Sequence, residues 1–203
     1  MKKFIRIGLF IILCTGLLSG CSQQTDVETS TVFIEKKGSV VSVDVEKFDK
    51  DYYEVKELET YIEKQIDAYD GGDGSVEKSS FDVKDGVAKL KMRYSSYEDY
   101  GKFNGIEFYI GSVVTAQAEG YDFDTEFYSV SEDLKDKKTV DSSKILADDD
   151  NKVAVIKANV DVQVPGKILF VSAKDTKVTA EDTVSITGEG ANEEAALTYI
   201  IYQ

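Results

Sequence analysis

Histidine and tryptophan are absent from this 203-residue chain, and cysteine occurs only twice and proline once. Without histidine the chain cannot form a Ser-His-Asp triad or a histidine-ligated metal site. It also lacks the side chain that most often serves as a general base near neutral pH. An enzyme built on this sequence would therefore have to use carboxylates, lysine or tyrosine.

The first twenty residues have the parts of an export signal. Lys2, Lys3 and Arg6 precede an apolar run, Ile7–Leu18, which is too short to cross a bilayer as a permanent helix. The run closes on Leu18-Ser19-Gly20-Cys21, which resembles the lipobox of bacterial lipoproteins. That resemblance implies a diacylglyceryl group on the Cys21 thiol and cleavage before it, so the protein would be anchored on the outer face of the cell membrane. The alternative is an ordinary secretory signal with an accidental cysteine.

Cleavage at this point would leave a mature chain without a free thiol. Cys14 lies in the discarded leader and Cys21 carries the lipid. The mature chain would then form no disulfide, thiolate nucleophile or cysteine metal site. Its 183 residues are enough for one well-buried domain, stabilised by its core alone.

The chain is strongly acidic, with a formal net charge of −14. The leader holds three of the 24 basic residues and no acids, so the mature part has 21 basic and 38 acidic residues, a net charge of −17. Such a surface repels nucleic acid and anionic lipid, so no nucleic-acid partner is expected. The acidity provides solubility; recruitment of cations or basic partners would need a local site.

The first third alternates between extended and helical patterns. Residues 22–30 are polar and unpatterned and predict a short tether. Apolar alternation on both sides of Gly38 predicts a β-hairpin over 32–45. A helix follows, with Asp51 as its N-cap and Gly71-Gly72 as its stop. Its apolar spacing of three and four residues is carried by Val55, Leu58, Tyr61, Ile62, Ile66 and Tyr69.

The remainder is mostly β-structure. A second hairpin turns at Asp85-Gly86, and a short helix runs from an N-cap at Ser96 to Asn104-Gly105. A strand is expected over Ile106–Thr115, and Pro165-Gly166 suits a type II turn between two strands. Further strands are expected at 153–157, 160–164, 167–172, 183–187 and 197–202. The apolar runs at 168–171 and 199–202 predict strands buried on both faces.

These patterns together predict an α+β fold. We expect antiparallel β-sheet, in one sheet or two, with one or two amphipathic helices packed on a face and a β-rich C-terminal third. Residues 31–203 would form a single domain. The alternative is a break into two subdomains within 119–150, where the pattern is weakest.

In this layout the chain resembles uncharacterised cell-surface lipoproteins of clostridia-like Gram-positive bacteria. The resemblance is carried by the lipobox, the Lys36-Lys37-Gly38 hairpin before an acidic helix, and the Val164–Val171 segment VPGKILFV. It covers the whole chain and implies a surface location. It brings no known activity.

Two acidic segments are candidate cation sites. The loop Asp70–Ser75 offers the carboxylates of Asp70 and Asp73 among glycines, as a calcium loop would. It breaks the EF-hand pattern, so the favoured interpretation is a helix stop and a loop, with no bound metal. Asp148–Asn151 predicts a solvated turn.

A third acidic segment surrounds two aromatic residues. Glu119, Asp122, Asp124 and Glu126 are interleaved with Tyr121 and Phe123. Paired carboxylates can hydrolyse glycosidic bonds, at a separation that sets the stereochemical outcome. Because acids are so abundant in this chain, a solvated loop is the favoured interpretation.

An aromatic segment is the remaining candidate for binding. Tyr97, Tyr100 and Phe103 share one helical face, and Tyr109 follows in the next strand. These rings would pack the short helix on the sheet. The alternative is an exposed platform that binds a glycan or a peptide.

The sequence therefore predicts a membrane-anchored extracytoplasmic lipoprotein whose folded part binds a ligand or a surface protein without catalysis. It has no expected cofactor beyond the lipid. One alternative is a carboxylate-dependent enzyme acting on cell-wall or dietary carbohydrate. Another is a structural or accessory subunit of a surface complex, which docks through an exposed strand edge.

Overall fold

The structure is a computed structural model that describes residues 26–131, 134, 137–148, 150–188 and 195–203. The predicted leader and the predicted lipidation site, Cys21, lie outside the described residues. No helix within the described part is long and apolar enough to cross a membrane.

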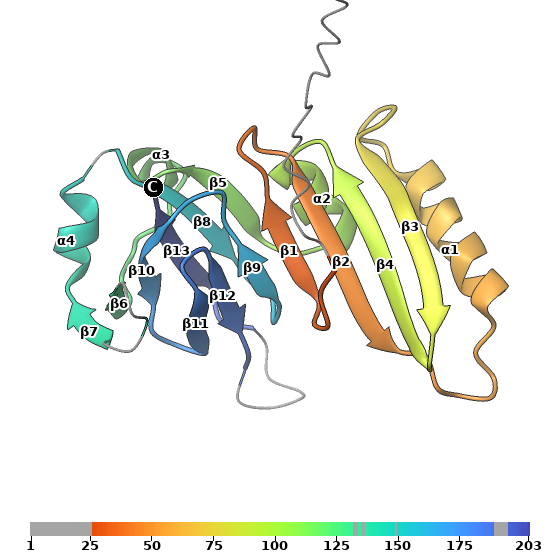
Figure 1. Ribbon diagram of the computed structural model, residues 1–203. Helices are drawn as coiled ribbons and strands as arrows, with labels where there is room; N and C mark the ends of the chain where they lie inside the picture. Colours follow the sequence, from red (N-terminus) through yellow and green to blue (C-terminus); the bar gives the residue numbers. More distant parts are fainter. Residues whose placement is uncertain (1–25, 132–133, 135–136, 149, 189–194) are drawn as a thin grey trace, which may run out of the picture.

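Two β-sheets stack face to face (Figure 1). Sheet A is mixed, because its strands pair antiparallel except for β1, which runs parallel to β9. Its strands, in spatial order, are β11 (Thr176–Ala180), β12 (Thr183–Ile186), β9 (Asp161–Gln163), β1 (Thr31–Ile34), β2 (Val40–Lys47), β4 (Val87–Tyr94) and β3 (Val76–Lys84).

Sheet B is antiparallel throughout. Its strands, in spatial order, are β5 (Phe108–Ser112), β8 (Lys152–Ile156), β13 (Thr198–Tyr202), β10 (Ile168–Ser172), β6 (Phe127–Val130) and β7 (Lys137–Val140). The α+β prediction and the two hairpins of the first half are confirmed. The parallel β1–β9 pair was not predicted, because its two strands are 130 residues apart and share no local turn signal.

Helix α1 (Val55–Ala68) is the predicted amphipathic helix, but it begins later than expected. The predicted N-cap, Asp51, is wrong, because a turn closed by the Tyr53 N–H on the Lys50 carbonyl (3.0 Å) comes first. Glu54 precedes the helix without a side-chain cap. The helix ends at Tyr69, before the predicted glycine stop.

Helix α2 (Tyr97–Asn104) has both predicted ends. The Ser96 hydroxyl accepts the Asp99 N–H at 3.1 Å, and Gly105 closes the helix in the left-handed conformation with φ of 66°. The strand predicted to reach Thr115 stops at Ser112, because Ser112 and Thr115 form a reciprocal capping box that starts α3 (Val113–Ala118). Helix α4 (Ser142–Leu146) was not predicted.

Part of the predicted tether belongs to the fold. The Val45 N–H donates to the Ser30 hydroxyl at 2.9 Å, and the Lys89 ammonium donates to the Val27 carbonyl at 2.8 Å. Val27 also packs against an apolar cluster of sheet A. The described part of this polar segment is attached to sheet A through its backbone and its single valine. A polar composition alone therefore does not identify a free tether.

The Pro165-Gly166 connection links the two sheets. It joins β9 of sheet A to β10 of sheet B, and Gly166 lacks the positive φ that a type II turn requires, so that prediction is wrong. The glycine is needed for a close approach instead. A Cβ at Gly166 would lie 1.9 Å from the carbonyl oxygen of Gln203.

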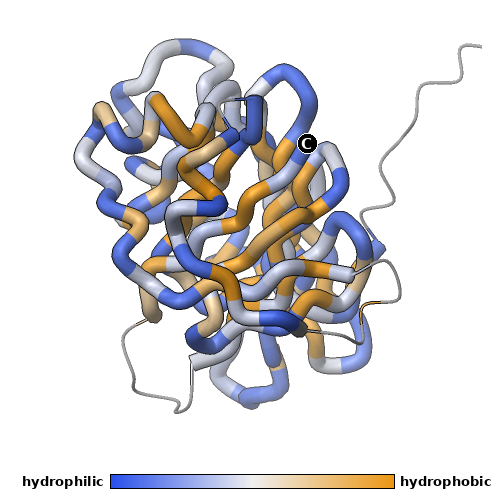
Figure 2. The backbone as a smooth tube through the Cα atoms, turned by 90° about the vertical axis from the view of Figure 1, so that its left-hand side faces the viewer, coloured by the Kyte–Doolittle hydropathy of each residue, from blue (hydrophilic) through white to orange (hydrophobic). Residues whose placement is uncertain are grey.

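Apolar side chains form three layers. The inner faces of both sheets share the largest cluster, to which α1 and α2 contribute. A second cluster covers the outer face of sheet B, beneath α3, α4 and the loop that carries Phe123. A smaller one, with Phe33 at its centre, lies on the outer face of sheet A. Figure 2 shows the apolar strands inside and the hydrophilic turns outside.

Candidate functional site

A cleft of about 240 Å³ opens beside the second apolar cluster, on the side of sheet B that faces away from sheet A. We call it the acidic tyrosine cleft, because three exposed carboxylates and two tyrosines line it. Its lining residues are Glu107, Glu119, Gly120, Tyr121, Asp122, Leu197 and Tyr199.

Distant parts of the chain supply this lining. Glu107 directly precedes β5 and Tyr199 lies in β13, two strands that both pair with β8. Helix α3 ends at Glu119, and Gly120 turns the chain with φ of 99°, so that the Tyr121 N–H donates to the Ala116 carbonyl at 3.0 Å.

Below Asp122 the chain is fixed to the core. The Asp122 carboxylate accepts the Asp124 N–H at 3.0 Å, which closes a tight turn. Phe123, at the centre of that turn, is fully buried and adopts a positive φ of 55°. Its ring lies 4.9 Å from the Tyr199 ring, between centroids. The acidic loop predicted as solvated is therefore held down by an aromatic side chain, while its carboxylates stay exposed.

Four tyrosine rings form a continuous series behind the carboxylates. Their centroids are 5.6 Å apart for Tyr97 and Tyr109, 5.2 Å for Tyr109 and Tyr121, and 6.3 Å for Tyr121 and Tyr199. Tilted and edge-on ring pairs at such distances are favourable. Because Tyr109 and Tyr199 are buried, the four rings form a rigid support behind the carboxylates of the cleft.

The tyrosine hydroxyls of the cleft stay protonated. Burial, and then the charge of Asp122, raise the pKa of Tyr199 to about 12. Burial, and then the neighbouring Glu107, raise the pKa of Tyr121. A tyrosine that acts as base or nucleophile needs the opposite shift. The negative charge of the cleft therefore comes from its carboxylates alone.

The predicted aromatic segment is divided between two layers. Tyr100 is buried among Tyr94 and Phe108, and half-buried Phe103 packs against Tyr69 and Tyr94. Tyr97 is half-buried and Tyr109 buried, and these two belong to the ring series behind the cleft. Ligand binding by the four residues stays a prediction.

Exposed aromatic rings occur elsewhere in the fold, before and within α1. Tyr52 and Tyr61 expose 75% and 59% of their surface, and Tyr53 lies beside Tyr52 with centroids 4.9 Å apart. The apolar spacing of α1 had placed Tyr61 on the packed face. Its position at the margin of that face explains its exposure.

The predicted cation segments are exposed turns. In the Asp70–Ser75 loop, the carboxylates of Asp70 and Asp73 are exposed, and the Ser75 hydroxyl donates to the Gly71 carbonyl at 2.5 Å. In the second segment, the Asp148 carboxylate accepts the Asp150 N–H at 3.1 Å; Asp149 lies outside the described residues. Across the described residues, no three acidic side chains are grouped so as to hold a metal ion.

A larger cleft of about 570 Å³ lies where the ends of β1, β9 and the β11–β12 turn meet. Among the described residues no aromatic ring lines it, and two of its three acids have partners. Glu35 pairs with Arg93 at 3.0 Å, and Asp182 accepts from the Gln163 amide at 2.7 Å. Its mixture of paired charges makes it less distinctive than the acidic tyrosine cleft.

Comparison with protein-family models, with curated proteins and with solved structures finds no match to this chain.

Proposed function

We propose that this protein is a lipid-anchored extracytoplasmic module that binds a basic segment of another protein at the acidic tyrosine cleft, without chemical turnover. The observation that carries the proposal is the convergence of Glu107, Glu119 and Asp122 beside the rings of Tyr121 and Tyr199. Support for the anchor comes from the leader and lipobox of the sequence, which also carry the resemblance to surface lipoproteins.

The chemistry of the cleft matches a guanidinium group. Carboxylates bind arginine through paired hydrogen bonds, and the half-buried ring of Tyr121 can attract a cation over its face. The buried ring of Tyr199 supports Tyr121 from behind. Arginine uses both modes, because its planar group can stack on a ring while it donates to an acid. An arginine-bearing segment of a neighbouring protein is therefore the occupant that this lining supports best.

Apart from the carboxylates, the side chains that could act as a base or nucleophile favour binding over turnover. The chain has no histidine, and the pKa values of the cleft tyrosines are raised. The pKa of Lys78 is raised by its hydrogen bonds to Glu59 and Glu63, and that of Lys89 by its bond to Glu28. These shifts keep the four groups protonated, so none of them is poised as a base or nucleophile.

A carboxylate-dependent glycan hydrolase is the second candidate, because the same acids lie beside aromatic rings. Incubation of the protein with soluble cell-wall glycan distinguishes the two. Release of new reducing ends that disappears in Glu107→Gln would favour the hydrolase over the binding module.

The proposed binding is tested by titrating the mature, lipidated chain in detergent micelles with a short arginine peptide. A fluorescein label on the peptide, followed by its anisotropy, reports binding without interference from the twelve tyrosines of the chain. The variant Glu119→Gln/Asp122→Asn removes two charges from the cleft, and we expect affinity to fall about tenfold, as for two partly exposed charge pairs.

The matched control removes two charges elsewhere. Asp73→Asn/Glu181→Gln has the same net charge, and both of its sites are exposed and outside the cleft lining. This control variant should bind the arginine peptide as tightly as the unaltered chain does. A lysine peptide of the same length should bind more weakly than the arginine peptide to the control variant and to the unaltered chain. Equal loss of affinity in the two double variants would mean that general acidity attracts the peptide, and the proposal would be wrong.

A further inference from the structure

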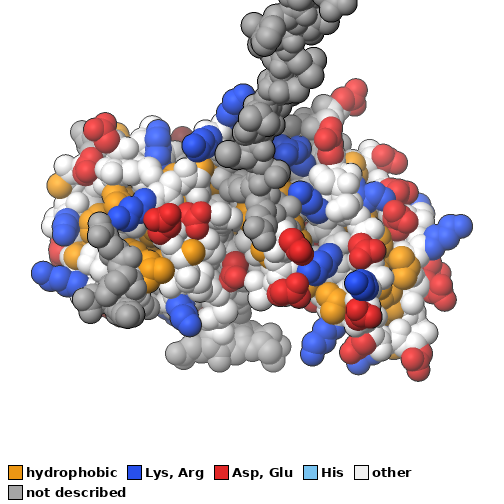
Figure 3. Space-filling model, in the orientation of Figure 1, with side chains coloured by type: hydrophobic (Ala, Val, Ile, Leu, Met, Phe, Trp, Pro, Cys, Tyr) orange, Lys and Arg blue, Asp and Glu red, His pale blue; other side chains and the backbone are white. Residues whose placement is uncertain are grey.

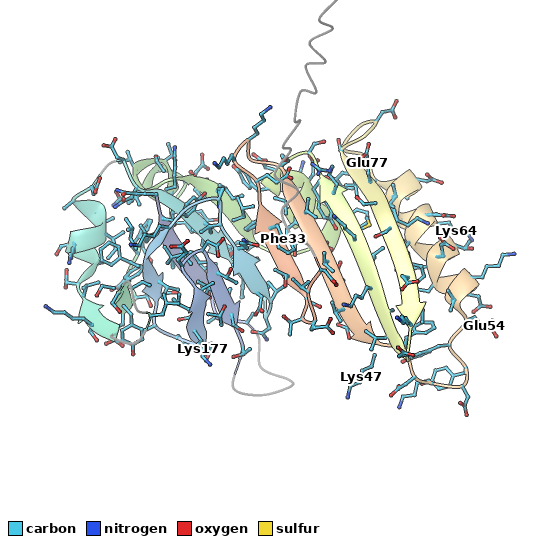
Figure 4. The ribbon with its side chains drawn as sticks, in the orientation of Figure 1. Phe33, Lys47, Glu54, Lys64, Glu77 and Lys177 are labelled. Atoms are coloured by element: carbon cyan, nitrogen blue, oxygen red, sulfur yellow. The ribbon has the colours of Figure 1, made fainter. Side chains whose placement is uncertain are left out.

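The outer face of sheet A carries a basic row beside an apolar row. Side chains alternate along a strand, so the strand register determines which of them share this face. The basic row is on β4 and the apolar row on β2, with one phenylalanine on β1: Lys89, Lys91 and Arg93; Val41, Val43 and Val45; Phe33. Figure 4 shows Phe33, Lys47, Glu77 and Lys177 spread over this face.

This face is far less acidic than the chain as a whole. Its strands contribute six basic and three acidic side chains, and Asp26, Glu28 and Glu35 add three acids that pair with Lys89 and Arg93. The six basic residues are Lys47, Lys84, Lys89, Lys91, Arg93 and Lys177, and the three acids are Glu77, Asp82 and Asp161. The face is therefore balanced, whereas the mature chain carries −17. Figure 3 shows both signs intermingled over the visible part of it.

The N-terminal segment Asp26–Ser30 is bound to this same face. The Lys89 ammonium contacts the carboxylates of Asp26 and Glu28 at 3.6 and 3.1 Å. The Thr29 hydroxyl donates to Asp161 at 2.9 Å, and Val27 packs against the Phe33 cluster. The described chain thus begins on the outer face of sheet A.

The distance from this face to the predicted anchor is short. Asp26 follows Cys21 by five residues, which span at most about 18 Å when fully extended. We infer that the outer face of sheet A is turned toward the bilayer surface and that the acidic tyrosine cleft points away from it. This inference rests on the lipid anchor of the proposed function.

The layers of the fold place the cleft on the opposite side. From the bilayer outward come the outer face of sheet A, the shared core, sheet B, and the cluster beneath α3 and the cleft. An anionic bilayer repels acidic groups within about one Debye length, roughly 8–10 Å. The balanced face can approach such a surface, while the carboxylates of Glu119 and Asp122 are kept from it.

The orientation can be measured with thiol-attached dyes. Cys14 and Cys21 are the only cysteines, so a new cysteine in the lipidated mature chain is the only free thiol. Lys84→Cys and Lys177→Cys mark the outer face of sheet A; Gln117→Cys on α3 and Asp124→Cys beside the cleft mark the opposite side. Each labelled protein is reconstituted in phosphatidylglycerol-containing vesicles with an acceptor dye on the lipid headgroups.

We expect roughly threefold more energy transfer from the Lys84 and Lys177 positions, because two sheets about 10 Å apart and their outer layers separate the two sides. Equal transfer from both sides in vesicle-bound protein would overturn the orientation and leave the anchor intact. Protein that does not float with the vesicles would overturn the anchor, and the orientation with it. Stronger transfer from Gln117 would mean that the cleft faces the lipid.

A second variant tests the role of the bound segment. Lys89→Met removes the contacts to Asp26 and Glu28 and keeps a long apolar stem on the strand. The difference in transfer between the two sides should shrink, while the far-ultraviolet spectrum and peptide binding stay unchanged. If the difference in transfer stays unchanged, the Lys89 contacts to Asp26 and Glu28 do not help to orient the domain. The inferred role of the bound segment Asp26–Ser30 would then be wrong.

Discussion

The two sheets differ in how their strands are covered. Two strands of sheet B are buried on both faces, since all five residues of β13 and four of five in β8 are buried. In the neighbouring β10, Leu169 and Phe170 are half-buried. In sheet A, only the middle strand β1 is buried throughout, whereas the edge strand β3 alternates between covered and exposed positions. Helices α3 and α4 and the Phe123 loop cover the outside of sheet B, whereas the outside of sheet A has the short segment Asp26–Ser30. An unbroken apolar run thus indicates a second covering layer.

The largest expected difference in stability comes from making the same substitution on the outer face of each sheet. Val153 in β8 is fully buried and Val45 in β2 is half-exposed. Val153→Ala should lower the free energy of unfolding by about 2–3 kcal/mol, and Val45→Ala by less than about 1 kcal/mol. Urea unfolding of both variants measures the difference. Equal losses would mean that the outer face of sheet A is covered as completely as that of sheet B.

Substitution in the Pro165-Gly166 connection between the sheets should lower the free energy of unfolding by almost as much. In Gly166→Ala the new methyl group would overlap the Gln203 carbonyl, which receives the Lys167 N–H at 2.9 Å. We expect a loss of about 1–3 kcal/mol, as in other overpacked sites. The control is Gly188→Ala, whose added Cβ would lie 3.3 Å from its nearest neighbour. A Gly166 variant as stable as this control in thermal unfolding would argue against the close approach.

Ionisation sharpens the contrast between the two sheets. Asp44 is half-buried on the inner face of sheet A, and burial raises its pKa although the Ser42 hydroxyl donates to it at 3.1 Å. The polar residues buried in or beside sheet B are neutral and hydrogen-bonded: Ser172, Asn151 and Thr198. Ionised Asp44 therefore lowers stability at neutral pH.

A pH series of unfolding experiments tests this. The folded state binds the Asp44 proton more tightly than the unfolded state, so the penalty disappears as the pH falls through the folded pKa toward the unfolded value near 3.9. Asp44→Asn should be more stable than the unaltered chain at pH 7, and this gain should shrink on acidification. The exposed Asp73→Asn should show no such trend. A gain in stability that grows on acidification would mean that the pKa of Asp44 is lowered, and not raised, in the folded state.

The smallest expected effect concerns the N-terminal segment. The Lys89 contacts to Asp26 and Glu28 involve largely exposed acids. Lys89→Met should lower the free energy of unfolding by less than about 1 kcal/mol, and salt should reduce the difference. Lys84→Met is the control, because Lys84 lies on the same face and forms no ion pair with the described residues. A loss of several kcal/mol would show that the segment is part of the core of sheet A.

Local patterns in the sequence predicted local structure well. Both hairpins, the amphipathic α1 and the two ends of α2 follow from alternation, helical spacing and the Ser96 and Gly105 caps. The start of α3 was missed, because the β-branched Val113 and Val114 extend the preceding strand pattern. Only the reciprocal bonds of Ser112 and Thr115 end that strand.

Non-local features could not be predicted. The acidic tyrosine cleft joins Glu107 and Tyr199, which are 92 residues apart and meet because their strands flank β8. Glu119, Tyr121 and Asp122 are neighbours in the sequence and form one visible cluster. No local pattern points to Glu107 and Tyr199, which complete the lining, since strand order depends on packing across the whole sheet.

The positions of the two ends of the chain in the sheets determine when folding can finish. Strand β1, at the start of the fold, lies between β2 and β9, and β13, at the end, lies between β8 and β10. Closing contacts over such long loops costs entropy before any packing is gained, which slows folding. A chain still missing its last six residues has an open gap in the middle of sheet B. We therefore expect the fold to form only once β13 has emerged from the ribosome.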